Sequence, residues 1–263
     1  MAERYYWPGN PLYTPAAVTG TATGTIVELH GDEAHHLTRV MRQKTGDIVT
    51  LFDGDGHEFS AEITETQKNR VLFRILGVRD VDTEPPCRVT VAVSLPKSDR
   101  QKWLVEKLTE LGCHRLIPLQ TERSVAQCND QVLERLRRQV LEATKQCNRT
   151  RLMQISPEQT IAGFGGVQSS EIRVQSNHNH SELTSWIAHP RSDDDFGQCD
   201  LSDLMQAALP KRVLVLVGPE GGFTRQEVEQ AVTLGMQPLD LGPRILRVET
   251  AAMVLTAILT ALP

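Results

Sequence analysis

The chain lacks the cysteine patterns that indicate a metal site or a disulfide framework. Its five cysteines stand at positions 87, 113, 128, 147 and 199, so they are odd in number, widely spaced and without a CxxC pair. The adjacent His35 and His36 have no cysteine or carboxylate partner at ligand spacing, and we expect them on a helix face. Neither a metal site nor a disulfide-stabilised fold is therefore expected.

Long hydrophobic runs are also absent. The longest apolar tract, residues 251–262, is too short to cross a bilayer and contains two threonines. The first ten residues, MAERYYWPGN, contain no apolar stretch of the kind found in signal peptides. We therefore expect a soluble protein of the reduced cytoplasm, whose 263 residues suffice for one large domain or two smaller ones.

Positive charge is scarce overall but unevenly distributed. The net charge of -5 argues against a protein that coats nucleic acid nonspecifically. It divides into -3 over residues 1–80, +3 over 81–160 and -5 over 161–263. The basic stretch 123–151 could contact phosphate groups, although charge alone favours a solvated helix face.

Two patterns divide the chain. Strand-like runs fill residues 25–79, with a DGDG turn at 53–56, which predicts a small β-barrel-like module. The stretch VDTEPPC at 81–87 breaks the periodicity and is the best candidate for a linker. From residue 88 onward strands alternate with helices, which predicts an α/β domain with a mostly parallel sheet covered on both faces. The last helix, from about Glu249, is apolar nearly all round, so its own domain or a partner subunit must enclose it.

The sharpest local feature is VLVLVGPEGGFT at 213–224, a buried strand that runs into a glycine-rich turn and then a helix. Thr224 and Glu227 predict a capping box at the start of that helix, as Ser98 and Gln101 do for a helix at 99–111. Ligands of open α/β sheets bind beyond the carboxyl ends of strands. The turn is neither a Walker loop nor a dinucleotide fingerprint, and by itself it could be a tight turn without a ligand.

A second strand-to-helix junction, LGPRILRVETAAM at 241–253, carries two arginines and a glutamate. Arg244 or Arg247 could hold an anion or a developing negative charge there. Alternatively, both are surface arginines, and Glu249 interacts with the helix dipole. Each of the two junctions could be explained without a ligand. Because both follow strands of the same predicted sheet, the pair favours a binding site more strongly than either junction does by itself.

Together these motifs resemble those of the SPOUT methyltransferases, and in particular the RsmE family, which methylates N3 of a uridine in 16S ribosomal RNA. The resemblance extends to RYY at 4–6, HHLTRVMR at 35–42, KSDRQKWLVEKLTELG at 97–112, TERSV at 121–125 and EATKQCNRTR at 142–151. It implies a PUA-like β-barrel for RNA binding at residues 1–80, the linker at 81–87, and a SPOUT domain at 88–263 with a C-terminal trefoil knot. It also implies a homodimer formed through the SPOUT domain, with 16S ribosomal RNA or the small ribosomal subunit as partner.

The resemblance further implies that S-adenosylmethionine binds in the knot and leaves as S-adenosylhomocysteine. The residues expected to bind it are His189, Pro190, Val217, Gly218, Pro219, Glu220, Gly221, Gly222, Leu241, Gly242, Ile245, Leu246 and Arg247.

The expected chemistry needs orientation and charge stabilisation rather than a covalent nucleophile. Uracil N3 attacks only once its proton is lost and charge moves onto O2 and O4. Arg247, which the resemblance places beside the methyl donor, is the expected catalytic residue, and either Glu249 or Glu220 could assist as the base. For RNA, we expect contacts from Arg4, Arg39, Arg42, Arg149 and Arg151, with Tyr5, Tyr6 and Trp7 as stacking surfaces.

Two other functions remain open at this point. The second domain could be catalytically inactive, which would leave an RNA-binding module. Alternatively, the same fold could methylate a ribose 2′-hydroxyl of RNA, although the predicted barrel and the LGPRILRVET sequence disfavour that activity.

Overall fold

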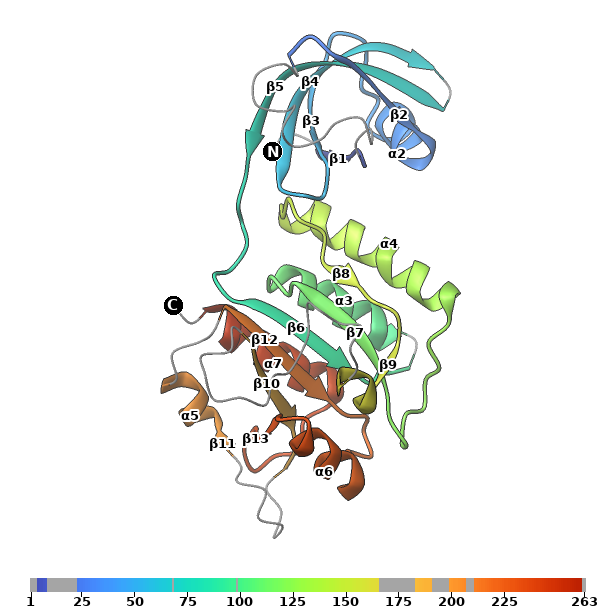
Figure 1. The fold of residues 1–263 in the computed structure, drawn as a ribbon. Coiled ribbons are helices and arrows are strands. Elements are labelled where there is room, and N and C mark those ends of the chain that lie inside the picture. The colour runs from blue at the N-terminus through green and yellow to red at the C-terminus, as the bar shows by residue number, and fades with distance from the viewer. Residues whose placement is uncertain are drawn as a thin grey trace. The chain divides into compact units, whose positions relative to one another are not determined.

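The computed structural model describes residues 4–8, 23–67, 69–97, 99–165, 183–190, 199–206 and 211–261 (Figure 1). The chain divides into two compact units. The first unit contains residues 1–84 and 144–152, and the second contains residues 85–143 and 153–263. The sequence-based division differs from this one, because it treated 81–87 as a separate linker and assigned all of 88–263, including 144–152, to the second domain.

The first unit is built on a sheet of five described strands in the order β1-β3-β4-β5-β2. Strand β1 pairs with β3 in parallel, and the other pairs are antiparallel. Helix α2 continues directly into a π-helical turn, and its buried Ala34 and Leu37 join the core of the sheet. The elements are β1 (Arg4–Tyr6), β2 (Ile26–His30), α2 (Gly31–His35), the π-helical turn (His36–Val40), β3 (Ile48–Phe52), β4 (His57–Gln67) and β5 (Arg70–Asp80).

Ion pairs connect residues 144–152 to the rest of the first unit. The guanidinium of Arg149, whose side chain is only 5% exposed, donates from Nε to Glu84 Oε1 at 3.0 Å. The ammonium of Lys145 lies 2.7 Å from Glu33 Oε1. Buried charges are tolerated only when they are paired, so this segment and the first unit depend on each other.

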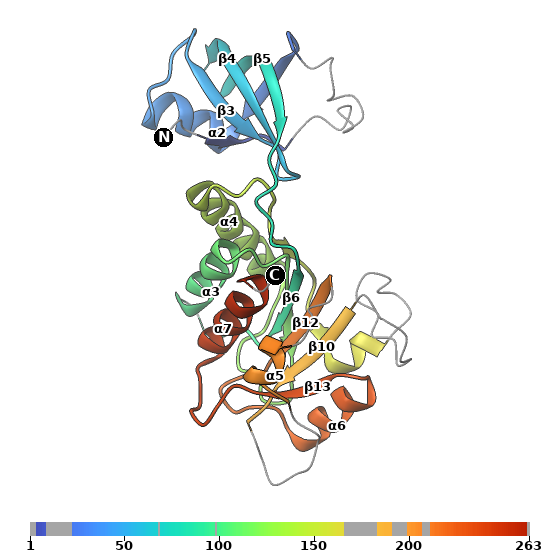
Figure 2. The same cartoon turned by 90° about the vertical axis from the view of Figure 1, so that its left-hand side faces the viewer.

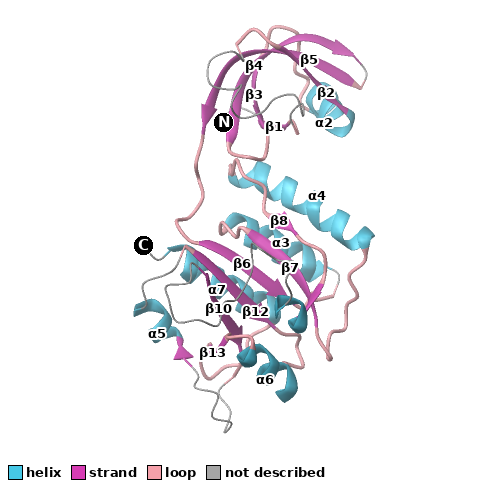
Figure 3. Cartoon of the chain, in the orientation of Figure 1, coloured by secondary structure: helices cyan, strands magenta, loops and turns pink. Residues whose placement is uncertain are grey.

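The second unit contains a sheet of eight described strands in the order β11-β13-β10-β12-β6-β7-β8, with β9 paired to β7. Every pairing in it is parallel (Figure 3). The strands are β6 (Arg88–Val93), β7 (Arg115–Gln120), β8 (Gln154–Ile155), β9 (Gln159–Thr160), β10 (Leu183–Ala188), β11 (Cys199–Asp200), β12 (Arg212–Val217) and β13 (Gln237–Asp240).

Helices cover both faces of this sheet, as its central strand β12 requires. Residues 213–217 of β12 are all buried. Leu214 and Leu216 pack in one cluster with Val228 and Ala231 of α6, whereas α7 packs on β6 and β12 from the opposite face (Figure 2). The helices are α3 (Asp99–Glu110), α4 (Asp130–Cys147), α5 (Leu201–Gln206), α6 (Arg225–Thr233) and α7 (Val248–Ala261). Among the described residues, no helix has both the length and the apolar character needed to cross a membrane.

The expected fold class is confirmed: a β-rich module precedes an α/β domain with a parallel sheet. The capping box at α6 is also confirmed, because Thr224 Oγ1 accepts from Glu227 N while Glu227 accepts from Thr224 N. The Ser98 half of the first expected capping box lies outside the described residues. In the structure the amide of Gln101 donates instead to the carbonyl oxygen of Pro96 at 2.7 Å.

Replacing Arg149 with alanine is expected to lower the free energy of unfolding by about 3–5 kcal/mol, because Glu84 would be left without its buried partner. Urea denaturation followed by circular dichroism measures the loss. As a control, Arg138→Ala breaks the exposed pair with Glu134 on α4 and should cost about 0.5 kcal/mol or less. Equal and small losses in both variants would contradict a structural role for the buried pair.

Candidate functional site

The carboxyl end of β12 continues into the glycine-rich turn. Gly222 adopts a left-handed φ of 68°, and its amide donates to the carbonyl oxygen of Pro219 at 2.8 Å. A Cβ at Gly218 would lie 3.0 Å from the ring of Phe223, so a side chain there would displace that ring. These glycines let the backbone fold back tightly just before the capped start of α6.

The carboxyl ends of β13 and β10 lie beside that of β12, because β10 is hydrogen-bonded between the other two strands. After β13, Asp240 Oδ1 accepts from the amide of Gly242 at 3.0 Å, and Gly242 has a φ of 101°. After β10, the amide of His189 donates to Leu239 O at 3.0 Å. Parallel strands end at the same edge of a sheet, so the register brings three connections together.

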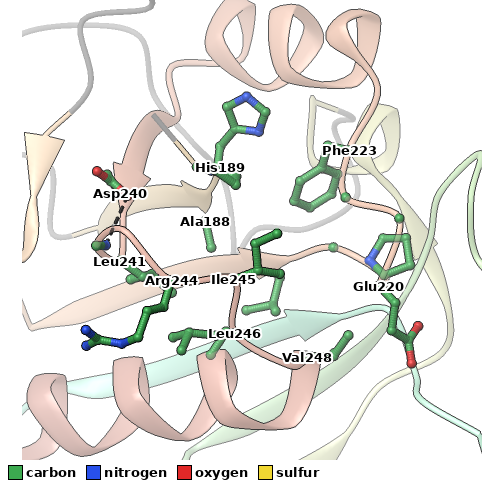
Figure 4. Close-up of a pocket in the computed structure, with 18 of the residues that line it drawn as sticks. Ala188, His189, Glu220, Phe223, Asp240, Leu241, Arg244, Ile245, Leu246 and Val248 are labelled. Atoms are coloured by element: carbon green, nitrogen blue, oxygen red, sulfur yellow. Dashed lines mark hydrogen bonds between the residues drawn. The ribbon is translucent and has the colours of Figure 1, made fainter. Parts of the chain in front are cut away.

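A cavity of about 370 Å³ lies among these three connections (Figure 4). Apolar side chains line much of it, and the carboxylates of Glu220 and Asp240 and the guanidinium of Arg244 are also present. Ile245 is 94% exposed even though it lines the cavity, so it presents an apolar surface that a ligand could cover. The volume and this mixture of groups are typical of small-molecule sites.

The cavity gathers every residue expected to bind the cofactor except Arg247. Arg247 is exposed and directly precedes α7, where its carbonyl oxygen accepts the hydrogen bond from Ala251 N. Several other lining residues were not among those expected to bind the cofactor, although most of them adjoin the two motifs and Arg244 was named as a group that could hold an anion. They are Ala188, Phe223, Asp240, Pro243, Arg244, Val248 and Ala251.

Residues far from the two motifs in sequence brace the glycine-rich turn. Arg123 Nη1 donates to the carbonyl oxygen of Gly221 at 2.6 Å, and Glu122 N donates to Glu227 Oε1 at 2.8 Å. From the first turn of α3, Arg100 Nη2 lies 3.1 Å from Glu220 Oε1. The TERSV and KSDR segments therefore support the cavity, a role that neither segment reveals by its own composition.

The arginines expected to contact RNA divide into two groups. Arg4 and Arg149 are buried in ion pairs of the first unit. Arg4 Nη2 lies 2.8 Å from Glu58 Oε1, and its guanidinium stacks 4.8 Å from the centre of the Phe52 ring. A phosphate contact from either arginine would require breaking its ion pair. The ion pairs therefore explain the positions of both arginines without any contact to RNA.

The remaining expected RNA contacts, Arg39, Arg42 and Arg151, are exposed in the first unit. Arg42 has a φ of 57°, a conformation that non-glycine residues rarely adopt and that tends to occur at functional positions. Of the expected stacking aromatics, Tyr5 and Trp7 are buried in the core of the sheet, and Tyr6 is half-buried against Phe52.

The cysteine thiols are poorly suited to nucleophilic catalysis. All five cysteines are free. Burial raises the pKa of Cys87 to about 11, and burial together with Glu158 and Asp130 raises the pKa of Cys128 to about 11. Burial likewise raises the pKa of Cys199. These three thiols therefore stay protonated at neutral pH, and only a thiolate is a strong nucleophile.

Family models match most of the chain. An RNA methyltransferase domain matches residues 83–260, and an RNA methyltransferase PUA domain matches residues 29–76. The chain is 32% identical over 225 residues to the ribosomal RNA small subunit methyltransferase E of Bacillus subtilis, with 85% of each chain covered. It is 30% identical over 249 residues to the protein of that name from Synechocystis, with 93% of this chain and 74% of the relative covered.

Solved structures resemble it over nearly the whole length. A Legionella pneumophila methyltransferase with bound S-adenosylmethionine has a TM-score of 0.79 at 29% identity, covering 99% of this chain and 98% of its own. A ribosomal RNA small subunit methyltransferase E from Neisseria gonorrhoeae, also bound to S-adenosylmethionine, has a TM-score of 0.76 at 29% identity, covering 98% and 96%.

Replacing Glu227 with alanine is expected to lower the free energy of unfolding by about 1–2 kcal/mol, because the capping box and the bond from Glu122 N are both lost. Hydrogen exchange should quicken at the amides of 218–224 in the same variant. The control is Glu229→Ala on the exposed side of α6, where the change should be about 0.5 kcal/mol or less. Unchanged exchange in 218–224 would show that Glu227 does not brace the turn.

Proposed function

The chain belongs to the RNA methyltransferase family whose members include ribosomal RNA small subunit methyltransferase E, and we propose that it methylates N3 of a specific uridine in 16S ribosomal RNA. The methyl donor is S-adenosylmethionine. The observation that carries this proposal is that the two motifs, GPEGG and LGPRILR, line one cavity at the carboxyl ends of β12 and β13, the parallel strands on either side of β10.

The residues of the cavity fit a cationic cofactor of moderate size. A volume of about 370 Å³ lies in the range of small-molecule sites. Leu241, Leu246 and Val248 offer apolar walls for a flat ring, and Glu220 and Asp240 offer negative charge for a sulfonium and an ammonium. Backbone groups at the glycine-rich turn can approach the ligand closely because no Cβ intervenes.

When bound, the cofactor supplies a methyl group already activated by its positive sulfur. The protein must then exclude water, hold the uracil ring in line and stabilise the negative charge that develops on its oxygens. Arg247 is exposed and directly precedes α7, and its guanidinium can donate hydrogen bonds to an oxygen of the bound base as negative charge develops there. No acid is needed for the leaving group, because a neutral sulfide leaves.

The first unit would bind the RNA. Its exposed arginines, Arg39, Arg42 and Arg151, can neutralise backbone phosphates, and a folded small subunit offers a shape that such a module can recognise. The net charge of -5 implies weak binding to arbitrary RNA, so selectivity would come from shape and from the target site. A ribosomal substrate would place the protein in the cytoplasm.

The test is transfer of labelled methyl groups to 16S ribosomal RNA, in naked and in ribosome-assembled form, followed by mass spectrometry of the nucleosides. We expect N3-methyluridine as the product. Cells without the protein should lack N3-methyluridine in 16S RNA. Persistence of that nucleoside, or a 2′-O-methyl product from the purified protein, would contradict the proposal.

Replacing Arg247 with alanine is expected to slow methyl transfer about 10²–10³-fold, the typical cost of removing one group that stabilises an oxyanion. Binding of S-adenosylmethionine should stay within about threefold of the wild type, because Arg247 lies outside the cavity lining. Isothermal titration calorimetry and single-turnover kinetics separate the two effects. The control is Arg244→Ala, which removes an arginine that does line the cavity and should weaken binding instead. Near-normal turnover of Arg247→Ala would contradict the assignment.

The active unit would be a homodimer that covers the outer side of α7. The apolar side chains of Met253, Val254, Ala257 and Ile258 there are only half-buried. On α3, which contacts α7, Trp103 is 42% exposed. Apolar surface of this kind is typical of a protein interface.

Ile258→Asp is expected to convert the dimer to a monomer, because a charge would be buried without a partner at the interface. Sedimentation velocity measures the change. Val232→Asp on α6 provides the control, since it places the same charge at an exposed apolar residue on the opposite side of the sheet. A wild-type protein that sediments as a monomer at micromolar concentration would contradict the dimer.

A further inference from the structure

Glu249 carries a buried carboxylate that the fold does not fully satisfy. The side chain, in the first turn of α7, is only 5% exposed. Its Oε2 atom is buried and has no hydrogen-bond partner among the described residues. A buried carboxylate oxygen without a donor is costly, so it suggests a donor that arrives with a ligand.

Arg100 is the charged group that faces Glu249. From the first turn of α3, its Nη1 lies 3.8 Å from Glu249 Oε1, and its Nη2 lies 3.1 Å from Glu220 Oε1. One guanidinium thus sits between two carboxylates, one of which lines the cavity. The contact with Glu249 is an ion pair that is too long to be a hydrogen bond, so it orients the carboxylate and leaves its acceptor capacity available.

The other elements packed against α7 add no charge near this carboxylate. Strands β6 and β12 contact α7, and their buried positions carry only uncharged side chains. In the part of the chain that the structure describes, Glu249 is paired with Arg100 and, beyond it, Arg100 is paired with Glu220; Arg247 precedes Glu249 by two residues in the chain.

A purely structural role does not account for Glu249. Acidic residues in the first turn of a helix are favoured by the helix dipole, and they usually remain exposed or accept first-turn amides. Among the described residues, no backbone amide donates to Oε2. Desolvating a carboxylate that has no hydrogen bond destabilises the fold by more than a favourable interaction with the helix dipole stabilises it.

We infer that Glu249 accepts the N3 proton of the target uracil and that Arg100 is the positioning residue that orients it, an inference that rests on the proposed function. Glu249 is connected to the cavity through Arg100, which also pairs with Glu220, a residue of the cavity lining. The N3–H bond breaks, and its proton moves to Glu249 Oε2. The electron pair left on N3 forms the bond to the methyl carbon as the carbon–sulfur bond breaks, and the sulfur leaves as a neutral sulfide. Charge and atoms balance, because the sulfonium and the carboxylate together become a neutral sulfide and a carboxylic acid.

The test uses Glu249→Gln in the full-length protein, with single-turnover methyl transfer measured between about pH 7 and about pH 9. At pH 7 the rate is expected to fall about 10²–10⁴-fold, the usual contribution of a positioned base. The variant depends on uracil that has already lost its proton, so its rate should rise about tenfold per pH unit below the pKa of the imide, whereas the wild-type rate should stay nearly flat. RNA with 5-fluorouridine at the target, whose imide is more acidic, should restore part of the rate of the variant.

Arg100 is tested through its dependence on Glu249. Arg100→Ala should slow the wild type about tenfold or more and have little further effect in the Glu249→Gln background, because it acts through that carboxylate. Arg100→Lys should recover part of the rate. Glu229→Gln on α6 is the matched control and should behave as the wild type does.

Two measurements besides activity guard against misfolding. Glu249→Gln should bind S-adenosylmethionine within about threefold of the wild type by calorimetry, and it should melt at the same or a higher temperature, because a neutral amide is cheaper to bury. Glu249→Asp, which keeps a carboxylate, should retain the flat pH dependence at a lower rate. Equal pH slopes in Glu249→Gln and the wild type, or cofactor binding weakened tenfold or more, would overturn the inference. A wild-type protein that forms no N3-methyluridine would instead overturn the proposed function.

Discussion

The parallel register of β10, β12 and β13 is the constraint on which the rest of the molecule depends. Residues 213–217 of β12 are buried from both faces, so the strand must lie inside a sheet with helices on both sides. Its neighbour β10 then aligns with it residue for residue, and β13 aligns with β10. Because the three strands end at the same edge of the sheet, the connections that follow them lie close together, and the cavity lies among these connections.

Charge has three separate uses in this chain. In the first unit, the buried Arg149 pairs with Glu84 and the part-buried Lys145 pairs with Glu33, and these pairs connect residues 144–152 to the rest of the unit. In the second unit, Arg100 and Arg123 hold the glycine-rich turn from outside the cavity. Only the remaining exposed arginines are available to RNA. Neither the net charge nor a basic stretch in the sequence distinguishes these roles, because an arginine in a buried ion pair and an exposed arginine are the same residue in the sequence.

Sequence patterns predicted the architecture well where the physical signal is local. The apolar run 213–217, the change from strand-like to alternating patterns after residue 80, and the Thr224–Glu227 cap all depend on neighbours within a few residues. Short elements such as β8, β9 and β11 escaped prediction, because two-residue strands carry no periodicity of their own. Arg4 and Tyr5, which we expected to contact RNA, both lie in β1, which pairs in parallel with β3; Tyr5 is buried in the core of the first unit, and Arg4 pairs with Glu58. A strand of three residues at the start of a chain gives no alternating pattern to reveal that pairing.

The sequence by itself determined which segments could hold a ligand, because glycine-rich turns at strand ends and an arginine-rich junction are local signals, and the family motifs coincide with them. It also determined the order of strands and helices, from their periodicity. Only the tertiary structure decided which residues share the site. Arg100 is separated from Glu220 and Glu249 by more than a hundred residues, and no local pattern relates them; packing of α3 on α7 and the strand order bring the three side chains together. The same packing buries Glu249, whose Oε2 atom has no hydrogen-bond partner among the described residues.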